Sequence, residues 1–329
     1  MQYEIICVSE QSVVRPHGFN RQKFDEAVGM FLTNCRYRNL SPVTIQGYRD
    51  YLNGLRKDLE DWGLSIFELT PKDLSHRMVN QMREVGCATN TINGRIRTCQ
   101  QFFKFLWKDG ITETNLAANL RPIRFEKQII QTFTEEQVKA LLNQPDRNTF
   151  TGLRDYVIML IFLETGVRVA EMANMKTSDI NWEDQTIRIP TGKGRKFRIV
   201  PIQQTCIREL RRYMIERGNQ GCDNLWVTVF NKPYTRYGII DMVRRYRRRA
   251  GIKGVAGSCH TFRHTMAKFF LINGGDIFTL QSILGHATLE MTRQYVELFS
   301  SDIHYQHAKC SPIENLVANG GSFEESEGE

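Results

Sequence analysis

The sequence predicts a mainly α-helical protein of two domains, with a small antiparallel β-sheet in the second domain. Its 329 residues are enough for two domains, because domains average about 100–200 residues. Apolar residues recur every three or four positions through most of 22–118 and much of 133–316, which indicates amphipathic helices. Apolar and polar residues alternate within 180–202, as they do in half-buried strands.

The first domain is expected over 22–118 as a helical bundle, after an N-terminal extension at 1–21. One helix begins at Ser41, a good N-cap residue, and continues with Pro42 at its first position. A second helix is expected in "TNTINGRIRTCQQFFKFLWKDG", which ends at Gly110. The polar side of this second helix carries asparagine and arginine, so one side of the bundle is expected to be basic.

Residues 119–132 lose the helical period and combine Pro122 with several basic residues, so they are expected to form an extended basic linker. The second domain is expected over 133–316, and it opens with Thr134 and Gln137 at the spacing of a capping box. The last residues, 317–329, are expected to be an acidic, flexible tail.

The elements of the second domain can be assigned in order. The segment "GLRDYVIMLIFLETG" predicts a buried helix that stops at Gly166, and "VAEMANM" begins another. The strands "TIRIP" and "KFRIVPI", joined by "TGKGR", predict an antiparallel pair. Helices are then expected at 205–217, about 236–250, 260–273, 276–284 and 288–299. Most of them have a glycine at or near the end, where helices commonly stop.

Composition excludes several classes of protein. Eight cysteines are scattered without C-x-x-C spacing, which argues against a zinc module or a disulfide framework. The apolar run "VIMLIFL" is far shorter than the roughly 20 residues that span a bilayer, and the N-terminus lacks the features of a signal peptide. No membrane partner is expected, and the predicted location is the cytoplasm.

Charge points to a polyanionic partner. The net charge is +8, and residues 236–253 contain six Arg and one Lys against one Asp. The run "RRYRRR" within it has too few acidic neighbours for ion pairs along a helix. Contact with a phosphate backbone is the interpretation that this run favours over a merely solvated face.

The segment "SCHTFRHTMA" allows three interpretations: a metal site, a structural helix or a site that handles phosphate. His260 and His264 have the i, i+4 spacing of zinc ligands, but Thr261 stands where H-E-x-x-H has its glutamate. Arg263 would also oppose a bound cation. Four further motifs decide between the other two: "TGVRVAE" with Arg168 and Glu171, "TGKGRK" with Lys193, "LGH" with His286 and "RQYVEL" with Tyr295.

In this order and spacing the motifs resemble the catalytic domain of the tyrosine recombinases, the lambda-integrase and Xer-type family. The resemblance runs from "TFTEEQ" to "SPIENL". The helical first domain is similar to the core-binding (SAM-like) domain of that family through "LSPVTIQGYRDYL" and "TINGRIRTCQQFFKFL". The implied fold is therefore a helical core-binding domain followed by a tyrosine-recombinase catalytic domain.

The resemblance implies a role for each residue of the site. Arg168 and Arg263 bind the non-bridging oxygens of the scissile phosphate, with His286 beside them. Lys193 protonates the leaving 5′ oxygen. Tyr295 is the nucleophile and becomes a 3′-phosphotyrosine, and His260 assists the proton transfer at Tyr295. Glu171 and His264 support the structure.

The chemistry asks for the same residue types. A phosphodiester gains negative charge in its transition state, and planar Arg side chains bind two phosphoryl oxygens at once. A tyrosine has an unperturbed pKa of about 10, so neighbouring cations lower the cost of its phenolate form. The sequence shows neither a P-loop nor an acidic cluster for two-metal catalysis. No cofactor and no metal are therefore expected.

The expected partner is double-stranded DNA, together with further copies of this chain: monomer in solution, and dimer to tetramer on DNA. An excision protein or an accessory DNA-bending protein is left open as a further partner. The residues expected to face DNA are polar or basic ones from the first domain, the linker and the arginine-rich helix: Thr44, Tyr48, Arg49, Asn90, Asn93, Arg95, Arg97, Arg121, Arg124, Arg244, Arg245, Arg247 and Arg248.

The expected function is site-specific recombination that integrates or excises a mobile element, because "SSDIHYQHAKCSPIENL" resembles the ends of mobile-element integrases. Xer-type resolution of chromosome or plasmid dimers is the alternative within the family. A DNA-binding regulator without the chemistry and a type IB topoisomerase are the alternatives outside it. A bacterial protein of this kind would lie on the nucleoid when it is bound to DNA.

Overall fold

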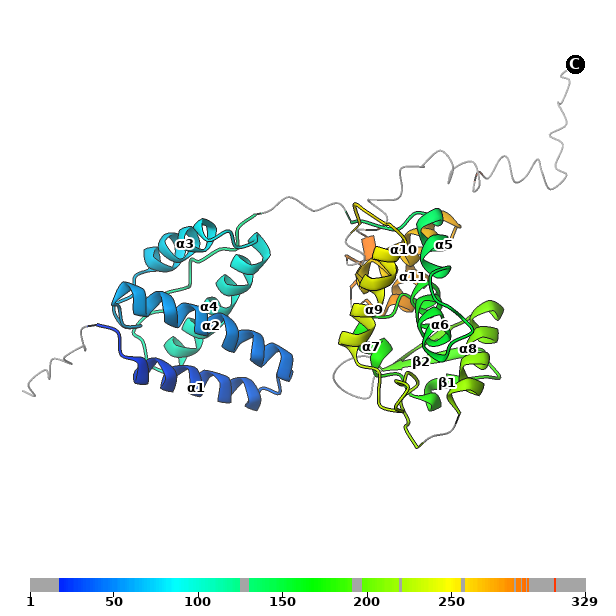
Figure 1. The fold of residues 1–329 in the computed structure, drawn as a ribbon. Coiled ribbons are helices and arrows are strands. Elements are labelled where there is room, and N and C mark those ends of the chain that lie inside the picture. The colour runs from blue at the N-terminus through cyan, green and yellow to red at the C-terminus, as the bar shows by residue number, and fades with distance from the viewer. Residues whose placement is uncertain are drawn as a thin grey trace, which may run out of the picture. The chain divides into compact units, whose positions relative to one another are not determined.

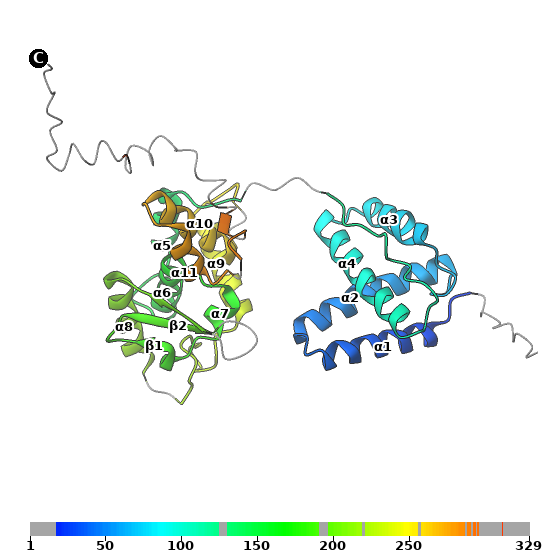
Figure 2. The ribbon, with the colours of Figure 1, turned by 180° about the vertical axis from the view of Figure 1, so that it is seen from behind.

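The computed structural model describes residues 18–124, 130–190, 197–218, 221–255, 258–286, 288–290, 292–293, 295 and 311. The chain divides into two units, Met1–Lys127 and Gln128–Glu329, and each has a hydrophobic core of its own. Figures 1 and 2 show a helical first unit and a second, mainly helical unit with a small sheet at one end. The predicted class, mainly α with a small antiparallel sheet in the second domain, is confirmed.

The first unit is a bundle of α-helices with one short π-helical segment at Asp73–Arg77. Ser41 caps its second helix by accepting a hydrogen bond from the Thr44 N–H at 3.1 Å, and Pro42 follows at the first position, as predicted. Aromatic rings fill the core, and Phe31 and Phe102 meet edge to face at 5.5 Å between ring centroids. The α-helices are α1 (Arg21–Tyr37), α2 (Pro42–Trp62), α3 (Met78–Glu84) and α4 (Thr89–Lys108).

Two residues of α4 that were expected to face DNA point into this bundle instead. The Arg95 guanidinium is buried and lies 2.6 Å from the carboxylate of Asp58 on α2. Asn93 is buried as well, and its amide both donates to and accepts from the backbone of Ile123. The prediction for these two side chains is wrong, because Arg95 pairs with a buried carboxylate and Asn93 hydrogen-bonds to the backbone within the unit.

In the second unit the strands form one antiparallel sheet in the order β1-β2-β3, with Ile187 opposite Val200. The strands are β1 (Ile180–Asn181), β2 (Thr186–Pro190) and β3 (Phe197–Pro201), preceded by a 3₁₀ turn at Thr177–Asp179. The helices are α5 (Glu135–Leu142), α6 (Phe150–Thr165), α7 (Val169–Ala173), α8 (Gln204–Arg217), α9 (Arg236–Arg249), α10 (Cys259–Ile272) and α11 (Ile277–Leu284). The helix predicted at 288–299 lies largely outside the described residues.

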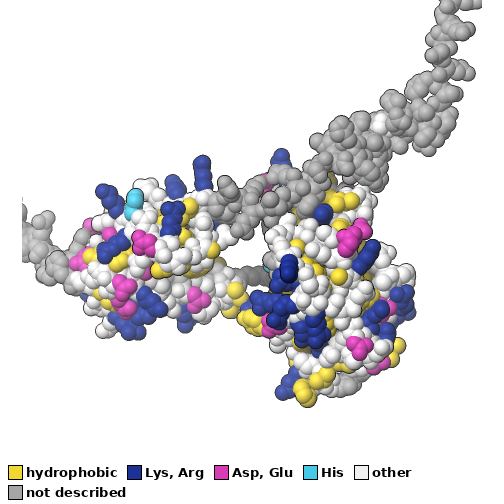
Figure 3. Space-filling model, turned by 45° about the horizontal axis from the view of Figure 1, so that its top comes forward, with side chains coloured by type: hydrophobic (Ala, Val, Ile, Leu, Met, Phe, Trp, Pro, Cys, Tyr) yellow, Lys and Arg dark blue, Asp and Glu magenta, His cyan; other side chains and the backbone are white. Residues whose placement is uncertain are grey.

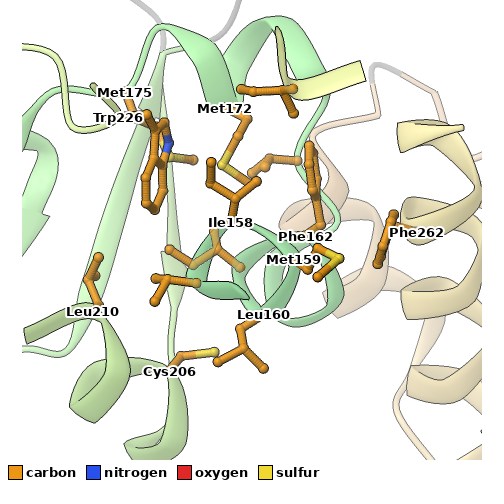
Figure 4. Packing of buried hydrophobic residues seen from close by; sticks show 14 of the residues in the cluster. Ile158, Met159, Leu160, Phe162, Met172, Met175, Cys206, Leu210, Trp226 and Phe262 are labelled. Carbon is orange, nitrogen blue, oxygen red and sulfur yellow. The ribbon is translucent and has the colours of Figure 1, made fainter. Parts of the chain in front are cut away.

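Helix α6 is the centre of this unit, because its apolar run "VIMLIFL" is buried almost throughout. It packs against α8 on one side and α10 on another. Figure 4 shows Phe162 of α6 beside Phe262 of α10, and the two rings are stacked with centroids 5.6 Å apart. Trp226 and Met175 lie in the same core, farther from α10 (Figure 4). The core therefore holds the C-terminal end of α6 close to the N-terminal end of α10. Both helix ends belong to the site described below.

A buried carboxylate ties the arginine-rich helix α9 to α6. Asp155 is fully buried, and its Oδ1 accepts from Nε and Nη2 of Arg154 at 3.0 and 2.7 Å. Its Oδ2 accepts from Arg245 and from the Tyr246 hydroxyl, both on α9 and both at 3.1 Å. A buried carboxylate is tolerated only with such partners. The contacts hold α9 in place while Arg244, Arg248 and Arg249 are exposed.

We expect Asp155→Asn to lower the free energy of unfolding of the second unit by about 3–5 kcal/mol, because it leaves the buried Arg154 charge without its partner. The measurement is urea unfolding followed by Trp226 fluorescence, in a chain whose other tryptophans, Trp62, Trp107 and Trp182, are replaced by Phe. Asp241→Asn is the control, since Asp241 is exposed on α9 and its pair with Arg244 is worth at most about 1 kcal/mol. Equal effects of the two substitutions would contradict the assignment.

Candidate active site

The site begins where α6 stops at Gly166. This residue is in the left-handed conformation (φ 59°), and a Cβ there would lie 2.6 Å from Leu284 and 3.3 Å from the sulfur of Met266. Glycine is therefore required both by the backbone conformation and by the close approach of other elements. Two residues later Arg168 stands at the start of α7. Its N–H donates to Glu171 at 2.9 Å, and its Nη1 donates to the other carboxylate oxygen at 3.1 Å.

Glu171 also binds Arg198 of strand β3, a residue that the sequence analysis did not single out. Nη1 and Nη2 of Arg198 donate to the two carboxylate oxygens at 3.1 and 2.8 Å, and its Nε donates to the Ile283 carbonyl at 2.7 Å. Burial acts to raise the pKa of Glu171, but the hydrogen bonds from Arg198 and Arg168 prevail and lower it. Glu171 is therefore ionised between two guanidinium groups.

A signal for Arg198 was present in the alternation of β3. Arg198 and the buried Val200 are two residues apart, so their side chains share one face of the strand. An arginine on the inward face of a strand calls for a buried partner. The sequence did not show which carboxylate that partner is.

Arg263 joins the ends of two helices. It lies on α10, whose N-terminus is capped by the Ser258 side chain. The residue is 4% exposed, and its guanidinium donates to the carbonyls of Gly166 at 2.6 Å and Leu284 at 2.8 Å, at the C-terminal ends of α6 and α11. Helix C-termini favour cations. Burial and the neighbouring Arg168 lower the Arg263 pKa to about 10, so the group is charged at neutral pH.

Tyr295 is buried among these elements with its side chain at 1% exposure. Its hydroxyl lies 2.8 Å from Nδ1 of His264, and its ring lies parallel to that of His286, with centroids 6.2 Å apart. His286 follows the end of α11, and its Nδ1 is 2.8 Å from the Thr292 hydroxyl. The sequence assigned His264 to support and His260 to the nucleophile. In the structure His264 is the histidine in contact with the hydroxyl, while His260 is exposed one helical turn away.

The environment keeps the histidines neutral and the phenol protonated. Burial, followed by the positive charges nearby, lowers the pKa of His264 and of His286 to about 4. The His260 pKa is lowered as well, by the partial burial of its ring and by the charges of Arg263 and Arg168. Burial raises the Tyr295 pKa, although Arg263 acts in the opposite direction. The arrangement thus combines fixed cations, neutral imidazoles and a buried phenol, which suits attack on an anionic ester.

The structure brings together most of the predicted catalytic set. Lys193 falls in 191–196, outside the described residues. Among the described residues, no group of three or more His, Cys, Asp or Glu side chains could hold a metal ion. Nor is any helix in that part of the chain long and apolar enough to cross a membrane. The residues that surround Tyr295 or contact one another near it are Arg168, Glu171, Arg198, Arg263, His264 and His286.

The remaining candidates for DNA contact differ in exposure. Tyr48 is half-buried, with its ring 5.4 Å from that of Phe31, and Arg247 is half-buried and donates to the Val255 carbonyl at 2.8 Å. Figure 3 shows Lys and Arg side chains gathered on one face of the second unit. The candidates that are exposed are Thr44, Arg49, Asn90, Arg97, Arg121, Arg124, Arg244, Arg245 and Arg248.

Comparison with known proteins gives matches over both units. The profile of the phage integrase family covers residues 131–301, and that of the phage integrase N-terminal SAM-like domain covers 35–110. The tyrosine recombinase XerC of Chlamydia caviae is 30% identical over 297 residues, which are 84% of this chain and 95% of that protein.

Two solved structures share the fold. The crystal structure of the XerH site-specific recombinase bound to a palindromic difH substrate has a TM-score of 0.70 at 20% identity, over 91% of this chain and 90% of that one. The Tn1549 transposon integrase in complex with transposon right end DNA has a TM-score of 0.69 at 18% identity, over 88% of this chain and 99% of that one.

We expect the second unit to lose stability as the pH falls from about 6.5 to about 4. His264 and His286 take up protons at about 6.5 in the unfolded chain but only at about 4 in the folded one, so acid favours unfolding in this window. Urea unfolding at about pH 7 and about pH 5, followed by Trp226 fluorescence, measures the loss. His264→Asn should reduce it, and His76→Asn, an exposed histidine of the first unit, should leave it unchanged. The same pH dependence in His264→Asn and in the parent chain would show that His264 does not contribute.

Proposed function

The chain belongs to the phage integrase family, the tyrosine recombinases, which cleave and rejoin DNA, and from this premise we propose that it is a site-specific recombinase whose nucleophile is Tyr295. The observation that carries the proposal is the grouping of Tyr295 with His264, His286 and Arg263 in the second unit. We propose the domains as the sequence predicts them: extension 1–21, core-binding domain 22–118, linker 119–132, catalytic domain 133–316 and tail 317–329.

The reaction uses the site in two steps. The Tyr295 oxygen attacks phosphorus, the bond to the 5′ oxygen breaks, and the chain becomes joined to a 3′ phosphate. Lys193 gives the 5′ oxygen its proton. A 5′-hydroxyl from another strand then attacks the phosphotyrosine and releases Tyr295. One ester bond replaces another in each step, so the reaction needs no nucleotide cofactor.

The two arginines stabilise the charge that develops on phosphorus. A guanidinium has five N–H groups, so Arg263 can keep both carbonyl contacts and still donate to a phosphoryl oxygen. Arg168 is the more exposed of the two and presents its side chain beside Glu171. His286 completes the group that binds the phosphate. A neutral His264 or His260 can accept the phenol proton as Tyr295 attacks.

Integration or excision of a mobile element is the role that we propose first. It rests on the segment "SSDIHYQHAKCSPIENL", which resembles the ends of mobile-element integrases and of which only Ser311 is described. Resolution of chromosome or plasmid dimers is the second role, and the match to a protein named XerC over nearly its whole length favours it. The DNA that the purified chain protects from nuclease distinguishes them. Protection at the two ends of an element supports the first role, and protection at one site on a circular replicon supports the second.

The partners in the proposal are duplex DNA and further copies of this chain, which assemble from monomers into dimers and tetramers on DNA. Formation of a four-way junction from two duplexes would separate a recombinase from a topoisomerase. A regulator without the chemistry would form no covalent adduct at all. We place the working protein in the cytoplasm, on the nucleoid.

The proposed chemistry predicts a covalent adduct with a duplex that carries the recombination site and a nick that traps cleavage. The adduct is detected on a denaturing gel, and we expect none from Tyr295→Phe. Arg168→Gln should slow single-turnover cleavage by about 10²–10³-fold, because it removes one preorganised donor to the charged phosphoryl group. Both variants should still bind the duplex in a gel-shift assay. An adduct that persists in Tyr295→Phe would overturn the choice of nucleophile.

The arginines of α9 give a separate prediction about DNA affinity. Arg244→Gln and Arg248→Gln should each weaken binding, and each should reduce the slope of log K against log salt by about 1, because one phosphate contact is lost. Arg208→Gln is the control, since Arg208 is equally exposed but lies on α8. Kd is measured by fluorescence anisotropy over a range of salt concentrations. A salt slope that stays the same in all three variants would place the DNA elsewhere.

A further inference from the structure

We propose that Arg198 is a positioning residue for strand cleavage: it fixes the Glu171 carboxylate and the end of α11, and through Glu171 it orients Arg168 toward the phosphate. Arg198 itself touches neither the phosphate nor the nucleophile in this proposal, which rests on the function proposed above.

The first support is the geometry around Glu171. Arg198 binds both carboxylate oxygens at 3.1 and 2.8 Å, so the carboxylate has little freedom to turn about its last bond. Arg168 binds the same two oxygens, one through its side chain and one through its N–H. The Arg198 and Glu171 side chains are 8% and 11% exposed, whereas that of Arg168 is 37% exposed. The buried pair is therefore a fixed base for a side chain that reaches outward.

The second support is charge. A single carboxylate beside Arg168 alone would cancel the positive charge that the phosphate needs. With Arg198 on the other side, the group of two arginines and one ionised Glu171 keeps a net charge of about +1. Arg198 thus lets Glu171 hold Arg168 in place while the group remains attractive to an anion.

The third support is the contact with the segment before His286. Nε of Arg198 donates to the Ile283 carbonyl at 2.7 Å. A Cβ on Gly285 would lie 2.9 Å from Cδ of Arg198 and 3.1 Å from its Nη1, so the Gly285 backbone packs directly on this side chain. Gly285 is in the left-handed conformation (φ 64°), and His286 follows it. One side chain therefore holds the supports of two proposed phosphate ligands, Arg168 and His286.

A purely structural role would not require this arrangement. Buried ion pairs stabilise a fold weakly compared with apolar packing, because both charges must lose water. The inward position on β3 would accept an apolar residue, as Val200 shows two residues on. The charge and the fork of Arg198 are accounted for by the three oxygen atoms that they bind, two of Glu171 and one of Ile283.

The test compares Arg198→Gln and Arg198→Lys with Arg188→Gln in the full-length chain. Arg188 is the control: it lies on the neighbouring strand β2, is more exposed than Arg198, and binds the Asp179 carboxylate instead of Glu171, through Nε and Nη2 at 3.1 and 2.9 Å. Single-turnover cleavage of the nicked duplex is measured at saturating protein, with Kd from anisotropy and Tm from circular dichroism.

We expect Arg198→Gln to slow cleavage by about 10–100-fold, as small displacements of catalytic groups do, with Kd changed by less than about 3-fold. Arg198→Lys should recover part of the rate, because it restores the charge without the fork. Arg188→Gln should cleave at the parent rate. A parent rate in Arg198→Gln, or a lowered Tm with no change in cleavage, would overturn the proposal. If Arg198→Gln does not fold, Arg198→Lys decides by the same criteria.

Two further measurements identify the route. Adding Arg198→Gln to Glu171→Gln should slow cleavage by less than Arg198→Gln slows it in the parent chain, because the route through the Glu171 carboxylate is already lost and only the contact with the end of α11 remains to be lost. A duplex with sulfur in place of the scissile 5′ oxygen has a leaving group that needs no proton. It should rescue Lys193→Ala but not Arg198→Gln. Rescue of Arg198→Gln would show that Arg198 acts through the hairpin that carries Lys193, which contradicts the proposal.

The outcomes separate this proposal from the proposed function. If the parent chain forms no adduct, or Tyr295→Phe still forms one, the function itself fails. If the parent chain forms the adduct through Tyr295 and Arg198→Gln cleaves at the parent rate, only the role of Arg198 fails.

Discussion

The arrangement of the second unit depends on arginine side chains that are charged although they are buried. Arg263 and Arg198 bind backbone carbonyls at the end of α11, and Arg263 also binds the carbonyl that ends α6. A buried cation must recover the hydration that it loses, and helix C-termini offer unpaired carbonyls with partial negative charge for this. The positions of three segments, the turn after α6, strand β3 and the end of α11, are set by this requirement. The residues proposed to handle the phosphate are attached to those segments.

The same requirement explains the electrostatics of the site. Positive groups without an equal number of carboxylates raise the local potential, and burial raises the cost of any further charge. His264 and His286 therefore stay neutral, and the Tyr295 phenol stays protonated within the described structure. An anionic phosphate changes this balance, because it supplies the negative charge that the site lacks. A site of this kind has a physical reason to react only when DNA is bound.

A buried carboxylate also fixes the helix that carries the basic surface of the second unit. Asp155 binds Arg154 and two residues of α9, so the exposed arginines of α9 lie on a helix whose buried side is held against α6. The first unit also has a buried ion pair between two elements: Asp58 of α2 pairs with Arg95 of α4. In both cases, as in the Glu171–Arg198 pair, an ion pair joins two elements and fixes their relative position more specifically than apolar packing alone.

The sequence by itself determined the class of fold, the sheet within 180–202 and most helices of the second unit, because periodicity is a local property. It also supplied candidates for the proposed site, because ordered motifs are local as well. It did not determine which polar side chains are buried. Arg95 and Asn93 were placed on the polar side of α4, yet Asp58 and the Ile123 backbone draw them inward. Arg198 and the contact of His264 with Tyr295 were missed as well. Each depends on a partner at least 27 residues away along the chain, and only tertiary packing brings such partners within hydrogen-bond distance.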